Sequence, residues 1–198
     1  MHYKAKNNIT IHPYSVFIQQ ENILTHSNII ISEFCWIQGG IKLVIGNFVH
    51  IGSHVSIGGG GVCLIEDFAT ISAGSRILAG TDLPLKEGLV DSTIPAEYRA
   101  VSRSFVHIGK YAFITTNVVI HPGVTIGEGA VIGSNSVVTK NIEPWTVNVG
   151  QPAKPIKDRP SENIKRLGEL LYKEKDILPC DMSQFLHLKK TTEHLPTI

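Results

Sequence analysis

Residues 108–138 read IGKYAFITTNVVIHPGVTIGEGAVIGSNSVV, and this stretch decides the fold. An aliphatic residue stands at every sixth position, and a small or branched residue follows it four places later. A period of six is neither the 3.6 of an α-helix nor the two of a half-buried strand. It is typical of a β-helix, in which three short faces close one coil around a column of aliphatic side chains. Because one coil cannot bury its own core, we expect the coils to stack.

The same rhythm extends toward the N-terminus, where glycines mark one corner of the predicted coil. Six-residue steps link Ile45, Ile51 and Ile57, whereas steps of eight residues follow Ile37 and Ile57. These two longer steps contain Gly39-Gly40 and Gly58 to Gly61, and they lie three faces apart. We therefore predict that they stack on one corner, where a bulging backbone needs the positive φ that glycine adopts.

A long interruption follows at the same corner. Three faces beyond Ile57 comes Ile77, after which the rhythm is lost over residues 78–107 before it resumes at Ile108. A long excursion from a rigid scaffold is usually functional. We expect a protruding loop that takes part in function, the alternative being a disordered surface insertion.

Composition favours one compact domain inside the cell. The chain has 198 residues, a net charge of +1 and 42% hydrophobic residues. The near-zero charge argues against a nucleic-acid partner, and the odd number of cysteines, without metal-ligand spacing, indicates reduced thiols in the cytoplasm. No apolar run reaches the length of a membrane span, so we expect neither membrane insertion nor export by a visible signal.

The repeat ends before a short C-terminal unit. Prolines after Val138 argue against further ladder pairing, and Ser161 precedes an apolar helical pattern that ends near Asp176. We predict a β-helix domain over residues 1–159 and a C-terminal unit over 160–198, with the helix packed against the last coils. The tail 177–198 has no clear period, and both a docking segment and a frayed terminus remain open.

Two motifs carry a family resemblance. The sequence GQPAKPI at residues 150–156 and TIPAEYR at residues 93–99, together with the six-residue steps, are similar to those of the left-handed β-helix acyltransferases that acetylate sugars. The resemblance covers about residues 10–176. It implies a left-handed all-β coil, a homotrimer with an active site between subunits, acetyl-CoA as the donor and no metal. It also implies a sugar acceptor, for which we favour a nucleotide-linked amino sugar used in surface polysaccharide synthesis, without deciding between an amine and a hydroxyl.

The donor would lie along the later coils and their end. Small residues let a ligand approach the wall, and the candidates for this role are Ala112, Ala130 and Ser134; for any one of them taken singly, corner geometry alone is the favoured explanation. Lys140, Lys154 and Lys157 gather where the family binds the adenine nucleotide, and cationic groups stabilise phosphates. The alternative for these lysines is a solvated basic rim.

Acetyl transfer needs a base to take the acceptor proton, and histidine is the usual choice. His50 ends a face at an outward-facing corner and resembles the base of related sugar acetyltransferases; the alternative is a hydrogen-bonded corner histidine. His54 lies four residues on and is a candidate substrate contact. We expect His107 and His121 to be structural.

The loop supplies the other candidates. Asp82, at its root, resembles an acidic residue that orients the imidazole or binds an acceptor amine; Leu83 replaces a second acid of the family, which puts the usual substrate in doubt. Glu97, Tyr98 and Arg99 are candidate substrate contacts, with loop scaffolding as their alternative.

Two other functions are known alternatives for a coil of this kind. A γ-type carbonic anhydrase shares the coil but holds zinc with three histidines, and the spacing of His50 and His54 does not match its ligands. A non-catalytic trimeric scaffold is the other alternative, and both the loop and the end motif argue against it.

Overall fold

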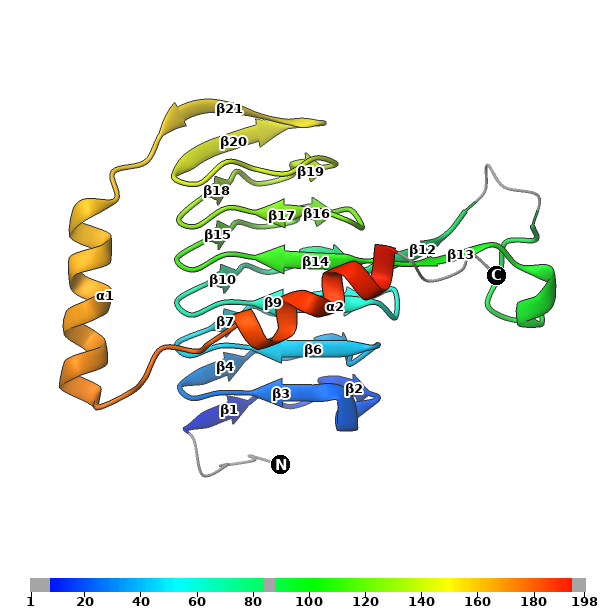
Figure 1. Cartoon of the computed structure of the whole chain (residues 1–198), viewed down its shortest axis with the longest axis horizontal. Coiled ribbons are helices and arrows are strands. Elements are labelled where there is room, and N and C mark those ends of the chain that lie inside the picture. Colours follow the sequence, from blue (N-terminus) through cyan, green and yellow to red (C-terminus); the bar gives the residue numbers. More distant parts are fainter. Residues whose placement is uncertain (1–7, 84–87, 194–198) are drawn as a thin grey trace.

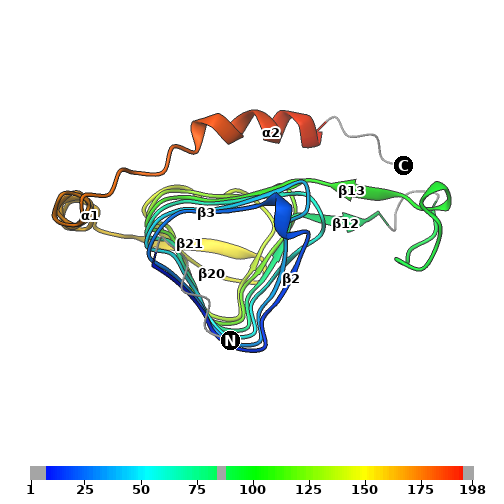
Figure 2. The same cartoon turned by 90° about the horizontal axis from the view of Figure 1, so that it is seen from below.

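A computed structural model of the chain describes residues 8–83 and 88–193. The chain winds around one axis in stacked coils, and three parallel sheets form the walls of a triangular prism (Figures 1 and 2). This arrangement confirms the predicted parallel β-helix. We name the walls the A, B and C faces and the corners between them AB, BC and CA, in the order in which the chain passes them.

The A face contains the strands that open each coil, in the order β1 (Ile9–Ile11), β4 (Ile29–Ile31), β7 (His50–Ile51), β10 (Thr70–Ile71), β15 (Phe113–Ile114), β18 (Val131–Ile132), β20 (Thr146–Gly150) and β21 (Ala153–Asp158). The B face contains β2 (Val16–Ile18), β5 (Trp36–Gln38), β8 (Ser56–Gly58), β11 (Arg76–Leu78), β16 (Val119–Ile120) and β19 (Val137–Val138). The C face contains β3 (Ile23–Thr25), β6 (Lys42–Ile45), β9 (Val62–Ile65), β14 (Phe105–Ile108) and β17 (Thr125–Ile126).

The aliphatic residues of the repeat form one continuous core. In the A face Ile51 pairs with Ile31 below it and Ile71 above it, so side chains of one type stack from coil to coil. Ile45, Ile65 and Ile126 are fully buried in the same cluster. Each fully buried isoleucine stabilises the fold by roughly 1.5–3 kcal/mol. Register is fixed because a slip of one residue would turn this whole set outward.

The glycine-bearing steps stack on the BC corner, as predicted, and the protruding loop leaves from there. Gly59 and Gly60 adopt φ of +92° and +70°, and a Cβ on Gly59 would lie 2.3 Å from the nitrogen of Gly80. The loop is an arm built from β12 (Gly80–Asp82) and β13 (Val101–Arg103), which pair antiparallel, with a 3₁₀ turn η2 (Ala96–Tyr98) toward its tip. It is shorter than the predicted 78–107, since Leu78 still belongs to β11 and the C face resumes at Phe105.

The C-terminal end of the prism corrects one expectation. Strands do continue after Val138: β20 pairs in parallel with β18, and β21 then folds back antiparallel on β20. Pro155 is accommodated because β21 is an edge strand and its pairing shifts next to this residue.

The C-terminal helices cover the prism from outside. The helix α1 (Glu162–Lys175) follows Ser161, whose side chain makes no capping bond, and it runs down the CA corner rather than staying at the last coils (Figure 1). The tail docks: α2 (Ser183–Glu193) lies over the C face, where Met182 packs with Val44, Leu64 and Phe105 (Figure 2). A further 3₁₀ turn, η1 (Gln20–Asn22), lies at the BC corner of the first coil.

One finding bears on membranes. Within residues 8–83 and 88–193, no helix combines the length and the apolar character that crossing a bilayer requires.

Candidate active site

His50 projects from the A face. It stands in β7 between Ile30 of β4 and Thr70 of β10, and its ring is exposed because the alternation along the strand turns Ile51 inward. Its Nε2 lies 3.1 Å from the hydroxyl oxygen of Ser32 in the coil below. This hydrogen bond orients the imidazole and leaves Nδ1 for another partner.

His54 stands at the AB corner with φ of +60°. Its ring lies 5.1 Å from the ring of Phe34 with the two planes tilted by 31°, and Phe34 stacks on Tyr14 at 5.3 Å with nearly parallel planes. All three side chains are exposed. We call them the open aromatic stack.

On the arm, Asp82 and Arg99 meet. A terminal guanidinium nitrogen of Arg99 lies 2.7 Å from Oδ1 of Asp82, and both side chains are mostly buried. The pair forms because the pairing of β12 with β13 brings the two ends of the arm together. Glu97 and Tyr98 lie farther out in η2 and are exposed. The structure therefore joins two of the four predicted arm residues in one ion pair.

Within one copy, His50 and Asp82 lie far from each other around the prism. His50 belongs to the A face, whereas the arm projects from the BC corner, which the A face does not reach (Figure 2). A single copy therefore does not bring the candidate base and the candidate acid together.

At the C-terminal end, Lys140 and Lys154 line a cavity of about 350 Å³ beside Asn148 and Pro152. Lys157 lies outside this cavity on β21, and its side chain is exposed. Ser134 is also exposed, and its hydroxyl donates a hydrogen bond to Oγ1 of Thr115 at 3.1 Å. Two of the three predicted lysines thus share one hollow.

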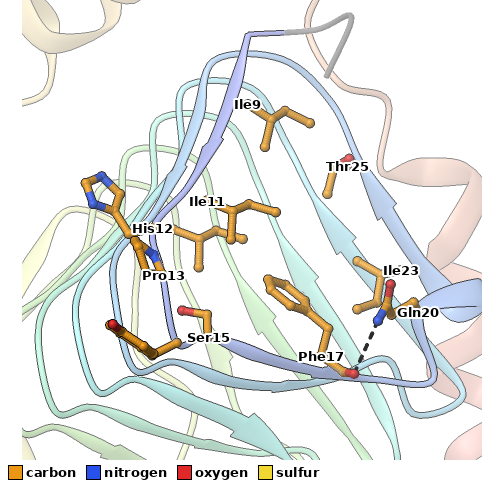
Figure 3. A pocket seen from close by; sticks show the side chains of 11 residues that line it. Ile9, Ile11, His12, Pro13, Ser15, Phe17, Gln20, Ile23 and Thr25 are labelled. Carbon is orange, nitrogen blue, oxygen red and sulfur yellow. Dashed lines mark hydrogen bonds between the residues drawn. The ribbon is translucent and has the colours of Figure 1, made fainter. Parts of the chain in front are cut away.

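A larger hollow of about 990 Å³ lies at the opposite end, inside the first coil (Figure 3). Ile9, Ile11, Phe17 and Ile23 line it with apolar side chains that extend the central column, while the ring of His12 lies at its outer edge. It contains none of the predicted catalytic residues. The volume of a hollow alone therefore does not locate the active site.

Comparisons with known proteins agree with this architecture. Residues 105–140 match the family described as bacterial transferase hexapeptide (six repeats). The chain is 36% identical over 166 residues to the dTDP-4-amino-4,6-dideoxy-D-glucose acyltransferase of Escherichia coli, which covers 82% of this chain and 83% of that protein. This chain belongs to the hexapeptide-repeat acyltransferases.

Other members of the hexapeptide-repeat acyltransferases are similar over most of the chain. The galactoside O-acetyltransferase of Escherichia coli K12 is 28% identical, over 74% of this chain and 71% of its own. The solved structure of AntD, an N-acyltransferase from Bacillus cereus in complex with dTDP and 3-hydroxybutyryl-CoA, has a TM-score of 0.78 and 30% identity, covering 85% of this chain and 89% of that one. The coil is therefore the left-handed β-helix of these acyltransferases.

Two of the residues predicted to contact the donor are placed differently by the structure. Ala112 and Ala130 point into the core, where they are 1% and 0% exposed. The position four residues after each inward isoleucine also faces inward, because the chain turns the corner between them. The side chains of these alanines therefore cannot touch a ligand on the wall. Arg159, which follows β21 near the C-terminal end of the prism, donates hydrogen bonds to the carbonyls of Tyr111 and Gly129. Its guanidinium therefore already has partners within the chain.

The remaining histidines of the repeat are arranged differently from His50. Nε2 of His107 lies 2.7 Å from a carboxylate oxygen of Glu66 on the C face. His121 is exposed at the BC corner. In the described part of the chain, no three His, Cys, Asp or Glu side chains gather as a metal site.

Three residues near these groups were missed by sequence reasoning. Ser32 hydrogen-bonds His50, Arg103 lies at the root of the arm, and Trp36 lies on the B face two coils below it. The contact of Ser32 could have been predicted from the sequence, because Ser32 precedes His50 by about the length of one coil and so lies near it in the coil below. Trp36 occupies an outward strand position where an aromatic residue is unusual for a solvated wall.

Proposed function

We propose that this protein transfers an acyl group from acyl-CoA to the amine of a nucleotide-linked amino sugar, with acetyl as the acyl group. The similarity to the dTDP-4-amino-4,6-dideoxy-D-glucose acyltransferase over four fifths of the chain carries this proposal. AntD supports it, since one of its variants was solved with dTDP-4-amino-4,6-dideoxyglucose and coenzyme A together. The exposed His50 and the arm supply the chemistry that such a transfer needs.

We propose a homotrimer in which the AB corner of each copy faces a threefold axis parallel to the prism. In this packing the A face of one copy lies opposite the B face of the next. Ile30 on the A face is 45% exposed and Val16 on the B face 51% exposed, whereas α2 already covers the C face. Exposed apolar patches mark interaction surfaces, and the open aromatic stack lies where the three copies would meet.

The same packing completes the active site. The arm leaves from the far edge of the B face, so it would reach over the A face of the neighbour and bring Asp82 toward the neighbour's His50. Glu97, Tyr98 and Arg99 would then contact the acceptor sugar, and His54 would lie deeper toward the axis. Neither face carries the complete set of groups alone.

The AntD structures suggest a further pair of residues. Variants of that protein were solved at a serine and at an aspartate ten positions farther along its chain. In this chain, Ser72 and Asp82 are the only serine and aspartate with that spacing. Ser72 directly follows β10 on the A face, one coil above Gly52, and Asp82 lies on the arm. We propose that both contact the acceptor amine, Ser72 from one copy and Asp82 from the next.

The reaction is a direct transfer between two bound substrates. The amine nitrogen attacks the carbonyl carbon of the thioester, and His50 accepts the proton that the nitrogen loses. A backbone N–H stabilises the oxyanion that forms. The carbon–sulfur bond then breaks, the thiolate takes the proton back from His50, and the products are an amide and free coenzyme A. Holding both substrates in line supplies much of the acceleration.

The donor would enter from the C-terminal end. Lys140 and Lys154 in the 350 Å³ cavity, with Lys157 nearby on β21, would pair with its phosphates. Ser134, on the coil below this cavity, would lie along the pantetheine arm. Because acyl-CoA and nucleotide sugars are made in the cytoplasm, we place the reaction there, as a step that supplies amino sugars for surface polysaccharides.

The test is a screen of donors and acceptors that follows the release of free thiol. Acetyl-CoA and 3-hydroxybutyryl-CoA are each offered with dTDP-4-amino-4,6-dideoxyglucose, with the same sugar without nucleotide, and with a galactoside. We expect rapid release only with acetyl-CoA and the nucleotide amino sugar. Faster release with the galactoside would replace amine transfer with hydroxyl transfer, and faster release with the longer donor would overturn acetyl as the acyl group.

A further inference from the structure

Two flat side chains, one on the B face and one at the root of the arm, lie over the glycine run of residues 58–61. Trp36 stands outward in β5, and its indole lies over Gly58 of the next coil, where a Cβ would come within 2.5 Å of the ring. Arg103 of β13 lies over Gly60, and its guanidinium donates a hydrogen bond of 2.9 Å to the carbonyl of Gly59. Side chains at Gly58 and Gly60 would displace both groups, so the glycine run fixes the positions of the indole and the guanidinium.

Both groups are available to a ligand. The indole is 39% exposed although one side of it lies against Gly58. Arg103 is exposed, and none of the described carboxylates pairs with it. Neither side chain belongs to the core, and among the described residues no carboxylate neutralises the guanidinium. The pair fits a flat ring that carries phosphates.

We propose that Trp36 and Arg103 form the nucleotide subsite of the acceptor, with the base stacked on the indole and the diphosphate paired with the guanidinium. This inference rests on the proposed function, which requires a nucleoside diphosphate on the acceptor. Bases stack on aromatic side chains, and arginine binds phosphate with two parallel hydrogen bonds.

The position of the subsite agrees with the path of the donor. Lys140 and Lys154 place the nucleotide of the donor at the C-terminal end of the prism, whereas Trp36 stands in the second coil. The reacting groups, His50 in the third coil and the arm that leaves the fourth, lie between these two ends. Donor and acceptor therefore enter the groove between copies from opposite ends and meet at its middle.

Steady-state kinetics of the full-length protein test the subsite. Trp36→Ala should raise the KM for dTDP-4-amino-4,6-dideoxyglucose about tenfold or more, as loss of one stacked base predicts, while kcat and the KM for acetyl-CoA stay unchanged. Trp36→Phe keeps a ring and should stay within about threefold of the wild type. An unchanged KM in a folded Trp36→Ala protein would overturn the role of the indole.

Arg103 is tested with a charge-matched control. Arg103→Gln should raise the same KM several-fold, whereas Arg166→Gln, an equal change of charge on the outer face of α1, should leave it unaltered. Equal effects of the two changes would mean that only net charge matters, and the proposal for Arg103 would fail.

A binding measurement separates this inference from the proposed function. The chain has two tryptophans, so titration with dTDP should change the fluorescence of the wild type and not that of Trp36→Phe, which retains only Trp145. A wild type that acylates an amino sugar but shows no dTDP response would refute the subsite and leave acyl transfer standing. A dTDP response that requires Trp36, without any thiol release, would refute the acyl transfer and leave the subsite standing.

Discussion

Two corners of the prism carry aromatic side chains stacked from coil to coil, and they differ in what covers them. At the CA corner, Phe48, Phe68 and Tyr111 stack with centroid distances of 5.0 and 5.1 Å and nearly parallel rings. Tyr172 of α1 packs against Phe68 with its ring tilted by 56°, and Lys110 lies over three of these rings. The chain itself closes this corner.

At the AB corner, the open aromatic stack repeats the same local geometry without a cover. Phe34 and Phe68 both adopt a left-handed backbone, with φ of +59° and +62°. This conformation costs a residue other than glycine about 1–3 kcal/mol, and stacking offsets part of that cost at both corners. Phe34, however, remains 50% exposed, and Tyr14 77% exposed.

The difference between the two corners indicates that one serves the stability of the single chain and the other the assembly of several chains. Where α1 covers the aromatic rings, they contribute to the folding of one chain. Where the rings stay exposed, they flank the two faces that bear His50 and Trp36. The open corner is thus the side of the prism that we propose for contact with other copies, and the following changes test the contrast.

The largest effect is expected on the open side, from His50→Ala. Loss of a general base lowers the rate by about 10²–10⁴-fold, so kcat for acetyl transfer should fall in that range. Sedimentation and coenzyme A binding should remain those of the wild type, because the imidazole is exposed and contributes nothing to the core. Near-normal turnover would exclude His50 as the base.

Next in size is the matched pair Phe68→Ala and Phe34→Ala. Removal of Phe68 from beneath Tyr172 should lower the free energy of unfolding by about 3–5 kcal/mol, as measured by denaturant titration. Phe34→Ala should cost the chain less than about 1.5 kcal/mol but should weaken trimers in sedimentation at low concentration. Equal losses of unfolding free energy would remove the distinction between the corners.

A substitution of Asp67 tests how α1 and the segment after it are held against the CA corner. Its two oxygens accept hydrogen bonds from the backbone N–H and the side chain of Asn47, from the hydroxyl of Tyr172 and from the backbone N–H of Cys180. Asp67→Asn turns one acceptor into a donor that faces donors, so we expect a loss of about 2–4 kcal/mol.

The same change should expose the C-terminal unit. Limited proteolysis should cut the segment between α1 and α2 faster in Asp67→Asn than in the wild type, while Asp158→Asn, an exposed control on β21, should behave as the wild type. If Asp67→Asn resisted cleavage like the control, Asp67 would not be what anchors the helices.

The smallest effect concerns alkaline pH. Burial, reinforced by the charge of Asp67, raises the pKa of the Cys180 thiol from 9.0 to about 12. Between these values the unfolded chain loses a proton that the folded chain keeps, so stability is full below pH 9 and falls as pH rises toward 12. Cys180→Ala should make the decline of Tm between pH 9 and 10.5 shallower, and an identical decline would contradict the burial of this thiol at the covered corner.

The sequence predicted the periodic part of the molecule well. The six-residue period determined which side chains face inward, and the eight-residue steps located the corner from which the arm leaves, because both depend only on spacing. The predicted donor contacts of Ala112 and Ala130 are wrong because they rest on the small size of these residues, whereas the six-residue period turns both side chains into the core. The roles of the candidate site residues remain predictions.

Long-range contacts could not be predicted from spacing. The course of α1 depends on the bond between Tyr172 and Asp67, which lie 105 residues apart, and the docking of α2 depends on apolar residues that the C face turns outward. The pairing of Asp82 with Arg99 likewise follows from the register of the arm, which no repeat encodes.

The two ends of the arm are adjacent, since the backbone N–H of Ser104 donates a hydrogen bond of 2.8 Å to the carbonyl of Ala79. An insertion that enters and leaves at one point leaves the coils above and below undisturbed. If the arm contacts the sugar as proposed, a hairpin grafted from a relative between these two residues would bring its own sugar preference to an unchanged scaffold. New sugar specificities could then arise by replacement of this one segment, without any change to the β-helix that supports it.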